Sequence, residues 1–193
     1  MTPRVLAHVT VALLVVVTAA GCAAPAVSYS EGEQARIDEY DRAAQRVFRS
    51  RDIAGPWPAV RVGWEGDLWE QGRPPAYYST KTGFADYGRP GVIVLNRRAL
   101  ADDFVAQAVL SQELAHFVLK HDADDRCRDR QAECDLEARV TSVEILMTGW
   151  DMSYNDAVRL QYAYLKSAVR RQTSVCPELQ GFASRYELTT TCD

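Results

Sequence analysis

The sequence predicts an α+β fold, in which a small antiparallel or mixed sheet packs with about four helices. Three observations favour this class. Residues 31–50 carry apolar side chains at helical spacing. Residues 59–95 contain short β-type runs separated by glycine and proline. Residues 102–168 then return to helical periodicity, so the expected order is one helix, the sheet and three further helices.

The first 21 residues are organised like a secretory signal peptide. Arg4 supplies a positive charge, residues 9–20 form an apolar run, and residues 19–21 give a small-residue cleavage region. The run is shorter than the about 20 residues that a bilayer-spanning helix needs. Ala-Ala-Gly-Cys at residues 19–22 resembles the bacterial lipobox, with alanine in place of the usual leucine. The resemblance implies a diacylated Cys22 and a membrane-anchored lipoprotein on the extracytoplasmic face.

The four remaining cysteines agree with export. An even number of cysteines in an oxidising compartment indicates two disulfides, for which three pairings exist. The spacing favours Cys127–Cys134 and Cys176–Cys192, because both pairs close short local loops. A four-thiolate zinc site is disfavoured because the chain has no C-x-x-C spacing.

The mature chain is expected to form one domain. Residues 22–30 read as a short tether, and residues 31–193 are long enough to bury a proper core. Ser30 and Glu33 have the spacing of a capping box at the start of the first helix. β-type runs follow, and they predict three short strands at residues 60–64, 77–79 and 92–95.

Three helices are predicted in the second half of the chain. Asp102 or Asp103 caps a helix that runs to about Lys120, and a second helix covers roughly residues 133–147. Ser153 caps the last helix, because Asp156 follows it at capping spacing. The tail from residue 177 has no period and is expected to be irregular.

Residues 104–121 combine an apolar helix with three adjacent polar side chains. The helix is apolar on nearly every side, which is typical of a buried helix. Gln112, Glu113 and His116 nevertheless share one face. A buried carboxylate or imidazole needs a partner. These groups are therefore expected to face a cleft, a metal ion or each other.

The run QELAHFVLKH at residues 112–121 resembles the H-E-x-x-H motif of zincin metallopeptidases, with glutamine in place of the first histidine. In zincins both histidines bind zinc, and the glutamate takes a proton from the zinc-bound water. The resemblance implies that His116 is a zinc ligand, that Gln112 occupies a degenerate ligand position and that Glu113 is the general base. The preceding run VIVLN resembles the gluzincin edge strand that pairs with an extended substrate.

Residues 135–151 extend this resemblance. They are similar to the E-x-E-A-D-R-x-G-x-x-L-L…G-Y-D segment of gluzincin metallopeptidases of the HtpX and BepA type. Ala138 sets the register, so the third zinc ligand falls on Asp135, with Glu133 as the alternative. The resemblance spans residues 92–169 and implies a zincin-like domain.

Two departures from the family pattern weaken this metal site. A neutral amide such as that of Gln112 is a poor zinc ligand, and the side chain of Asp135 is shorter than that of glutamate. His121 lies five residues beyond His116, about 140° round a continuous helix, and is not expected to share an ion with it. Zinc is therefore possible, but its absence is favoured.

The sequence thus favours an extracytoplasmic lipoprotein whose metallopeptidase-like domain is catalytically degenerate and acts as a binding or scaffold module. The alternative is an active zinc-dependent peptidase with a non-standard ligand set; a third reading makes the polar cluster purely structural. The expected partners are the membrane, through lipidated Cys22, and a peptide or envelope protein lying against residues 90–96. Acidic and basic residues are interspersed at a net charge of −4, which does not favour nucleic acid.

Overall fold

The computed structural model describes residues 29–62, 76–79, 92–121 and 127–192. The expected signal peptide and Cys22 lie outside these ranges. The elements in chain order are α1 (Glu31–Ser50), β1 (Ala59–Val62), β2 (Ala76–Ser79), β3 (Val92–Leu95), α2 (Arg97–Leu100), α3 (Asp103–Val118), α4 (Gln131–Trp150), α5 (Tyr154–Val169), the 3₁₀ turn η2 (Thr173–Val175) and α6 (Cys176–Arg185). Within the described ranges, no helix has both the length and the apolar character needed to span a bilayer.

Side-chain caps mark where α1, α3 and α5 begin. Ser30 and Glu33 form the expected capping box, in which each side chain accepts a hydrogen bond from the other residue's backbone N–H. Asp102, rather than Asp103, caps α3 by accepting from the N–H groups of the first turn. Ser153 caps α5 by accepting from the N–H of Asp156. Each cap satisfies N–H groups that have no partner inside the helix.

The three described strands form a mixed sheet in the order β1-β3-β2. β1 pairs in parallel with β3, and β2 pairs antiparallel to it, so a purely antiparallel sheet is excluded. β3 is therefore the central strand. The expectation that this segment is a substrate-pairing edge strand is wrong, because β1 and β2 already occupy both of its backbone hydrogen-bonding edges.

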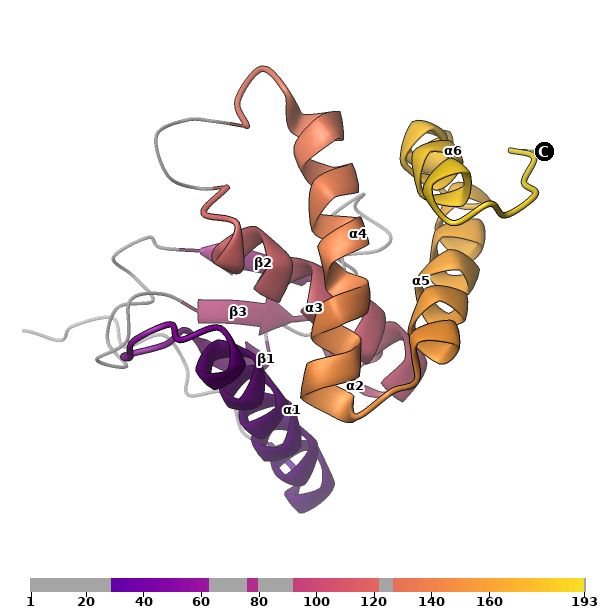
Figure 1. Cartoon of the computed structure of the whole chain (residues 1–193). Helices are drawn as coiled ribbons and strands as arrows, with labels where there is room; N and C mark the ends of the chain where they lie inside the picture. The colour runs from indigo at the N-terminus through magenta and orange to yellow at the C-terminus, as the bar shows by residue number, and fades with distance from the viewer. Residues whose placement is uncertain (1–28, 63–75, 80–91, 122–126, 193) are drawn as a thin grey trace, which may run out of the picture.

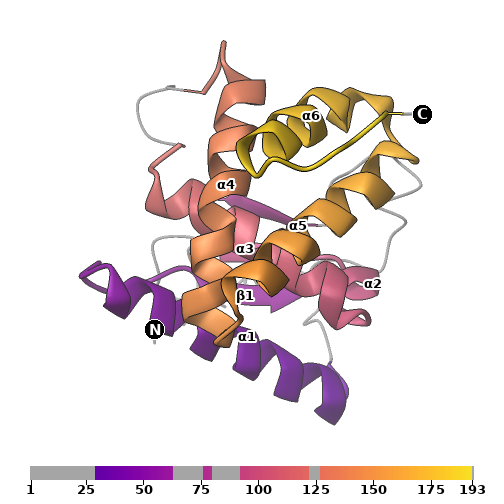
Figure 2. The same cartoon turned by 45° about the vertical axis from the view of Figure 1, so that its right-hand side comes forward.

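The helices form layers on the sheet. α3 contacts β2 and β3, and α1 contacts β1. The long helix α4 lies across α1 and α3, with α5 and α6 on its other side (Figures 1 and 2). One cluster of buried apolar side chains lies among α1, the sheet, α3 and α4, and a second lies among α4, α5 and α6. α4 therefore contributes side chains to both clusters.

The C-terminal segment is more ordered than the sequence predicts. Instead of an irregular tail, residues 176–185 form α6, with Pro177 in its first turn, where the missing N–H costs nothing. Leu179 and Phe182 are buried against α4 and α5. Gly181 permits the close approach, because a Cβ atom there would lie 2.6 Å from Cδ2 of Leu136.

Both expected disulfides are present. Cys127 is bonded to Cys134 at the start of α4. Cys176 is bonded to Cys192, which ties the end of the described chain back to the start of α6. The pairing predicted from the spacing is confirmed.

Candidate functional site

The face between α3 and α4 brings together two of the predicted zinc ligands. His116 on α3 places Nε2 3.6 Å from Oδ1 of Asp135 on α4, and their side chains are 14% and 30% exposed. Glu133, the alternative ligand, is exposed, and its carboxylate accepts a hydrogen bond of 2.6 Å from Nε of Arg130. The geometry therefore favours Asp135 over Glu133 as the carboxylate partner of His116.

Gln112, which the resemblance places at a degenerate ligand position, accepts a hydrogen bond from an arginine. Nη2 of Arg139 donates a hydrogen bond to Oε1 of Gln112, the only atom of that amide able to bind a metal ion. Arg139 is 3% exposed. It follows Ala138 directly, at the position where the metallopeptidase segment that the sequence resembles has aspartate. A buried cation thus stands at the position where the resembled segment has an acid.

The guanidinium of Arg139 is the centre of a network that joins four helices. Nε donates to Oε1 of Glu178 on α6 at 2.7 Å, and Nη1 donates to Oε1 of Gln161 on α5 at 2.7 Å. The guanidinium also lies over the ring of Tyr164, 5.1 Å from its centroid. The amide nitrogen of Gln161 donates in turn to Oγ of Ser111 at 2.8 Å. All three guanidinium nitrogens therefore donate to protein acceptors.

Sequence reasoning did not identify this network. Arg139 differs from the aspartate of the segment that the sequence resembles, and this difference was a signal that could have located the centre of the network. Glu178 and Gln161 had no comparable signal, because neither belongs to the motif and both reach Arg139 only through the packing of α5 and α6.

His121 lies beside His116 because α3 ends before it. The helix stops at Val118, and Lys120 adopts a left-handed backbone with φ 57°. The N–H of His121 then donates to the carbonyl of His116 at 3.0 Å. The N–H of Lys120 donates to the carbonyl of Phe117 at 3.1 Å. This pair of hydrogen bonds is a Schellman motif.

The turn overturns the expectation that the two imidazoles diverge. The expected 140° separation assumed that the helix continues through residue 121. Instead, Nδ1 of His121 lies 2.9 Å from Nδ1 of His116, and the ring centroids are 4.9 Å apart. Nε2 of the buried His121 lies 3.2 Å from Oε2 of Glu137. The two rings are therefore close enough to interact directly.

The surroundings of His116 oppose its protonation. Burial, together with smaller contributions from the charges of His121 and Arg139, lowers the pKa of His116 from 6.5 to about 4. Burial also raises the pKa of Asp135. His116 is therefore expected to be neutral near pH 7.

We expect the imidazole of His116 to titrate near pH 4. The pKa of this imidazole is about 4 in the folded chain and about 6.5 in the unfolded chain. Between these two pH values the unfolded chain therefore binds more protons than the folded chain. The stability contribution of His116 is thus complete above pH 6.5 and declines as the pH falls towards 4. NMR titration of the imidazole C–H resonances, assigned with a His116→Asn variant, measures the midpoint. A midpoint at or above pH 6 for His116 would contradict the described environment.

Glu113, the predicted general base, lies on α3 one residue from Gln112 and is half-buried. Burial raises the pKa of Tyr164, and the charge of Glu113 is a smaller cause in the same direction. Glu113 therefore lies close enough to the Arg139 network to interact with it electrostatically.

Comparison of the chain with protein-family models, curated proteins and solved structures found no match. The class defined by the structure is thus an α+β domain, mostly helical, with a small mixed sheet and two disulfides.

Proposed function

We propose that this chain is an extracytoplasmic lipoprotein whose metallopeptidase-like domain lacks zinc-dependent hydrolysis and acts as a binding or scaffold module. The observation that carries the proposal is the hydrogen bond from Arg139 to Oε1 of Gln112. This hydrogen bond occupies the oxygen atom that would have to bind zinc in place of the histidine nitrogen of the H-E-x-x-H motif.

The charge of Arg139 supports the same conclusion. An arginine side chain stays protonated in proteins, so a zinc ion between Gln112 and His116 would stand beside a fixed positive charge. The carboxylate of Glu178 offsets that charge. In a zinc-dependent reaction, Glu113 would deprotonate a metal-bound water. Without the metal, Glu113 has no acidified water to act on.

The alternative is an active zinc peptidase with a non-standard ligand set. One observation favours it: Nε2 of His116 and Oδ1 of Asp135 are 3.6 Å apart, close to the about 3.3 Å that separates two ligands of a tetrahedral zinc ion. A third ligand would then have to be a water molecule or a Gln112 side chain released from Arg139. Glu113 would remain the general base.

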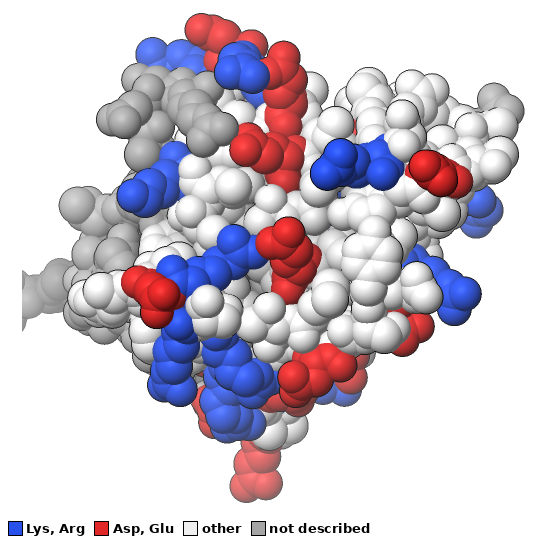
Figure 3. All heavy atoms as spheres, in the orientation of Figure 1, with Lys and Arg blue, Asp and Glu red and all other residues white. Residues whose placement is uncertain are grey.

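The position of β3 limits how a partner could bind. A peptide cannot add to β3, since that strand is paired on both sides. On the face shown in Figure 3, basic and acidic side chains of the described residues are interspersed. A partner docking on that face would meet charges of both signs, so shape and individual contacts would matter more than a single-sign field.

Metal content and hydrolysis test the proposal directly. The full-length chain, purified with both disulfides intact, is expected to retain less than about 0.1 equivalent of zinc by mass spectrometry, because tight structural or catalytic zinc needs a complete ligand set. Cleavage of a peptide library by the wild type and by Glu113→Gln is expected to be equal. Glu144→Gln is the matched control, since Glu144 is exposed and paired with Arg51, away from the candidate ligands.

The opposite result has a clear form. Near-stoichiometric zinc that is lost in His116→Ala, together with cleavage that is lost in Glu113→Gln and kept in Glu144→Gln, would establish the peptidase.

A further inference from the structure

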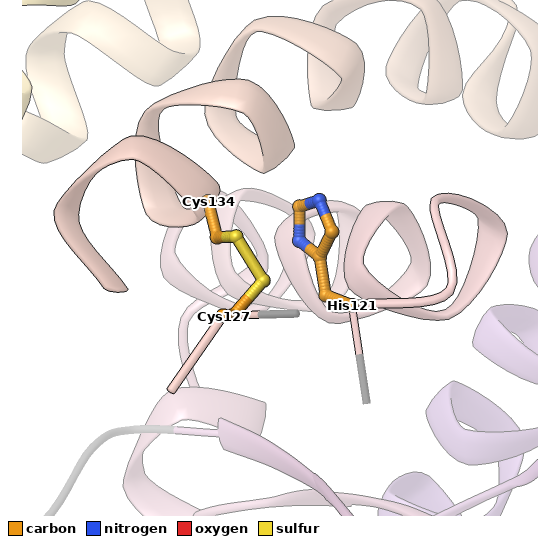
Figure 4. A group of neighbouring side chains, drawn as sticks. All are labelled: His121, Cys127 and Cys134. Atoms are coloured by element: carbon orange, nitrogen blue, oxygen red, sulfur yellow. A yellow bond between two sulfur atoms is a disulfide. The ribbon is translucent and has the colours of Figure 1, made fainter. Parts of the chain in front are cut away.

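A second group of side chains of the types that bind metals lies next to the His116–Asp135 pair. His121, Cys127 and Cys134 each offer one ligand atom, and these atoms lie within 4.8 Å of one another. All three residues are buried, with 3%, 8% and 4% of their surface exposed. Figure 4 shows the imidazole of His121 beside the Cys127–Cys134 disulfide. None of these residues contributes to the proposed zincin ligand set.

The fold holds the three side chains in place from separate elements. The Schellman motif at the end of α3 turns His121 back towards α4. Cys134 lies in the first turn of α4, and Cys127 lies just before that helix. A site built on two helix ends is more precisely positioned than one built on loops alone.

We infer that Cys127, Cys134 and His121 bind zinc when the Cys127–Cys134 disulfide is reduced. Two thiolates and one imidazole are soft and borderline ligands of the kind that zinc prefers. The disulfide and the zinc site use the same two sulfur atoms, so each state excludes the other.

The chemistry of the exchange balances with a dithiol as reductant. The Cys127–Cys134 disulfide accepts two electrons and two protons, and the dithiol becomes a disulfide. Zinc then replaces the two thiol protons, which pass to solvent. The ion thus gains two S–Zn bonds and one N–Zn bond, and a water molecule completes the tetrahedron.

The contacts of His121 prepare it to act as a ligand. Nε2 lies 3.2 Å from the carboxylate of Glu137, which favours the tautomer with the proton on Nε2. The lone pair then resides on Nδ1. A carboxylate that holds the second ring nitrogen of a histidine ligand is a recurrent feature of zinc sites. In the disulfide state, Nδ1 instead faces Nδ1 of His116 at 2.9 Å.

Cobalt titration tests this inference with the metal ion alone as the probe. The full chain, in a Cys22→Ser background, is reduced with a phosphine, which becomes a phosphine oxide by taking oxygen from water, and the phosphine is then removed. We expect Co²⁺ to give sulfur-to-cobalt charge-transfer bands and tetrahedral visible bands in the reduced chain only. Zinc should displace the cobalt at one equivalent. His121→Asn should weaken cobalt binding at least about tenfold.

Two double variants form a matched pair. Cys127→Ser/Cys134→Ser should abolish the bands, whereas Cys176→Ser/Cys192→Ser should keep them. Circular dichroism establishes that each reduced chain is helical. If a double variant unfolds, His121→Asn replaces it as the test variant, because it leaves every cysteine in place.

Absent cobalt bands in a folded, reduced wild type, or equal cobalt affinity in His121→Asn, would overturn the inference. Zinc bound by the disulfide form and lost in His116→Ala would contradict the proposed function and leave this inference standing.

Discussion

Replacing Arg139 with methionine is expected to lower the free energy of unfolding by about 3–5 kcal/mol, the usual cost of removing one partner from a buried ion pair. The Arg139 side chain is 3% exposed, and its guanidinium donates to Glu178, Gln112 and Gln161. Methionine fills much of the space but supplies no donor. The carboxylate of Glu178, 14% exposed as a side chain, would lose its ion-pair partner.

Urea denaturation measures this effect, and Arg159→Met is the matched control. Arg159 lies on α5 and is exposed, so the same substitution there should change stability by less than about 0.5 kcal/mol. Adding Glu178→Gln to Arg139→Met should recover part of the loss, because the unpaired charge is then removed. If Arg139→Met lowers the free energy of unfolding by less than about 1 kcal/mol, the Arg139 network does not stabilise the packing of the helices as argued.

Replacing Cys22 with serine is expected to move the chain from the membrane fraction to the soluble fraction. The proposed anchor consists of two acyl chains on Cys22, and each buried CH₂ contributes about 0.8 kcal/mol to membrane binding. Serine offers no thiol for thioether formation. Without lipid, nothing else in the proposal retains the domain at the membrane surface.

Fractionation of the producing cells, followed by detergent phase separation, measures this redistribution. Ala23→Ser is the matched control, because it makes a small polar change next to Cys22 and leaves the thiol in place. Membrane retention of Cys22→Ser equal to that of the wild type would exclude lipidation as the anchor.

The sequence alone determined the features that depend on near neighbours in the chain. The Ser30 capping box, the start of α5 at Ser153 and both disulfides involve residues close in sequence. The positions of the three strands followed from β-type runs between glycine and proline. α4 was predicted at residues 133–147, with a stop near Gly149, and in fact spans Gln131–Trp150, because no side chain caps its first turn and the helix continues through that glycine.

The candidate site was only partly predictable. The one-turn spacing of Gln112 and His116, and the register of Asp135, followed from the helical repeat and from the motif. The partner of Gln112 did not, since Arg139 reaches it from another helix. The contact between His116 and His121 was missed because a Schellman motif at Lys120 ends α3 before residue 121.

Tertiary structure alone decided the central position of β3, the helical state of residues 176–185 and the burial of Arg139. Strand order depends on pairing between segments far apart in the chain. α6 is short, and a short isolated helix is marginal in water, so its stability comes from Leu179 and Phe182 buried against α4 and α5. A guanidinium can be buried only where several helices bring acceptors to it at once, and the linear pattern of residues does not encode that convergence.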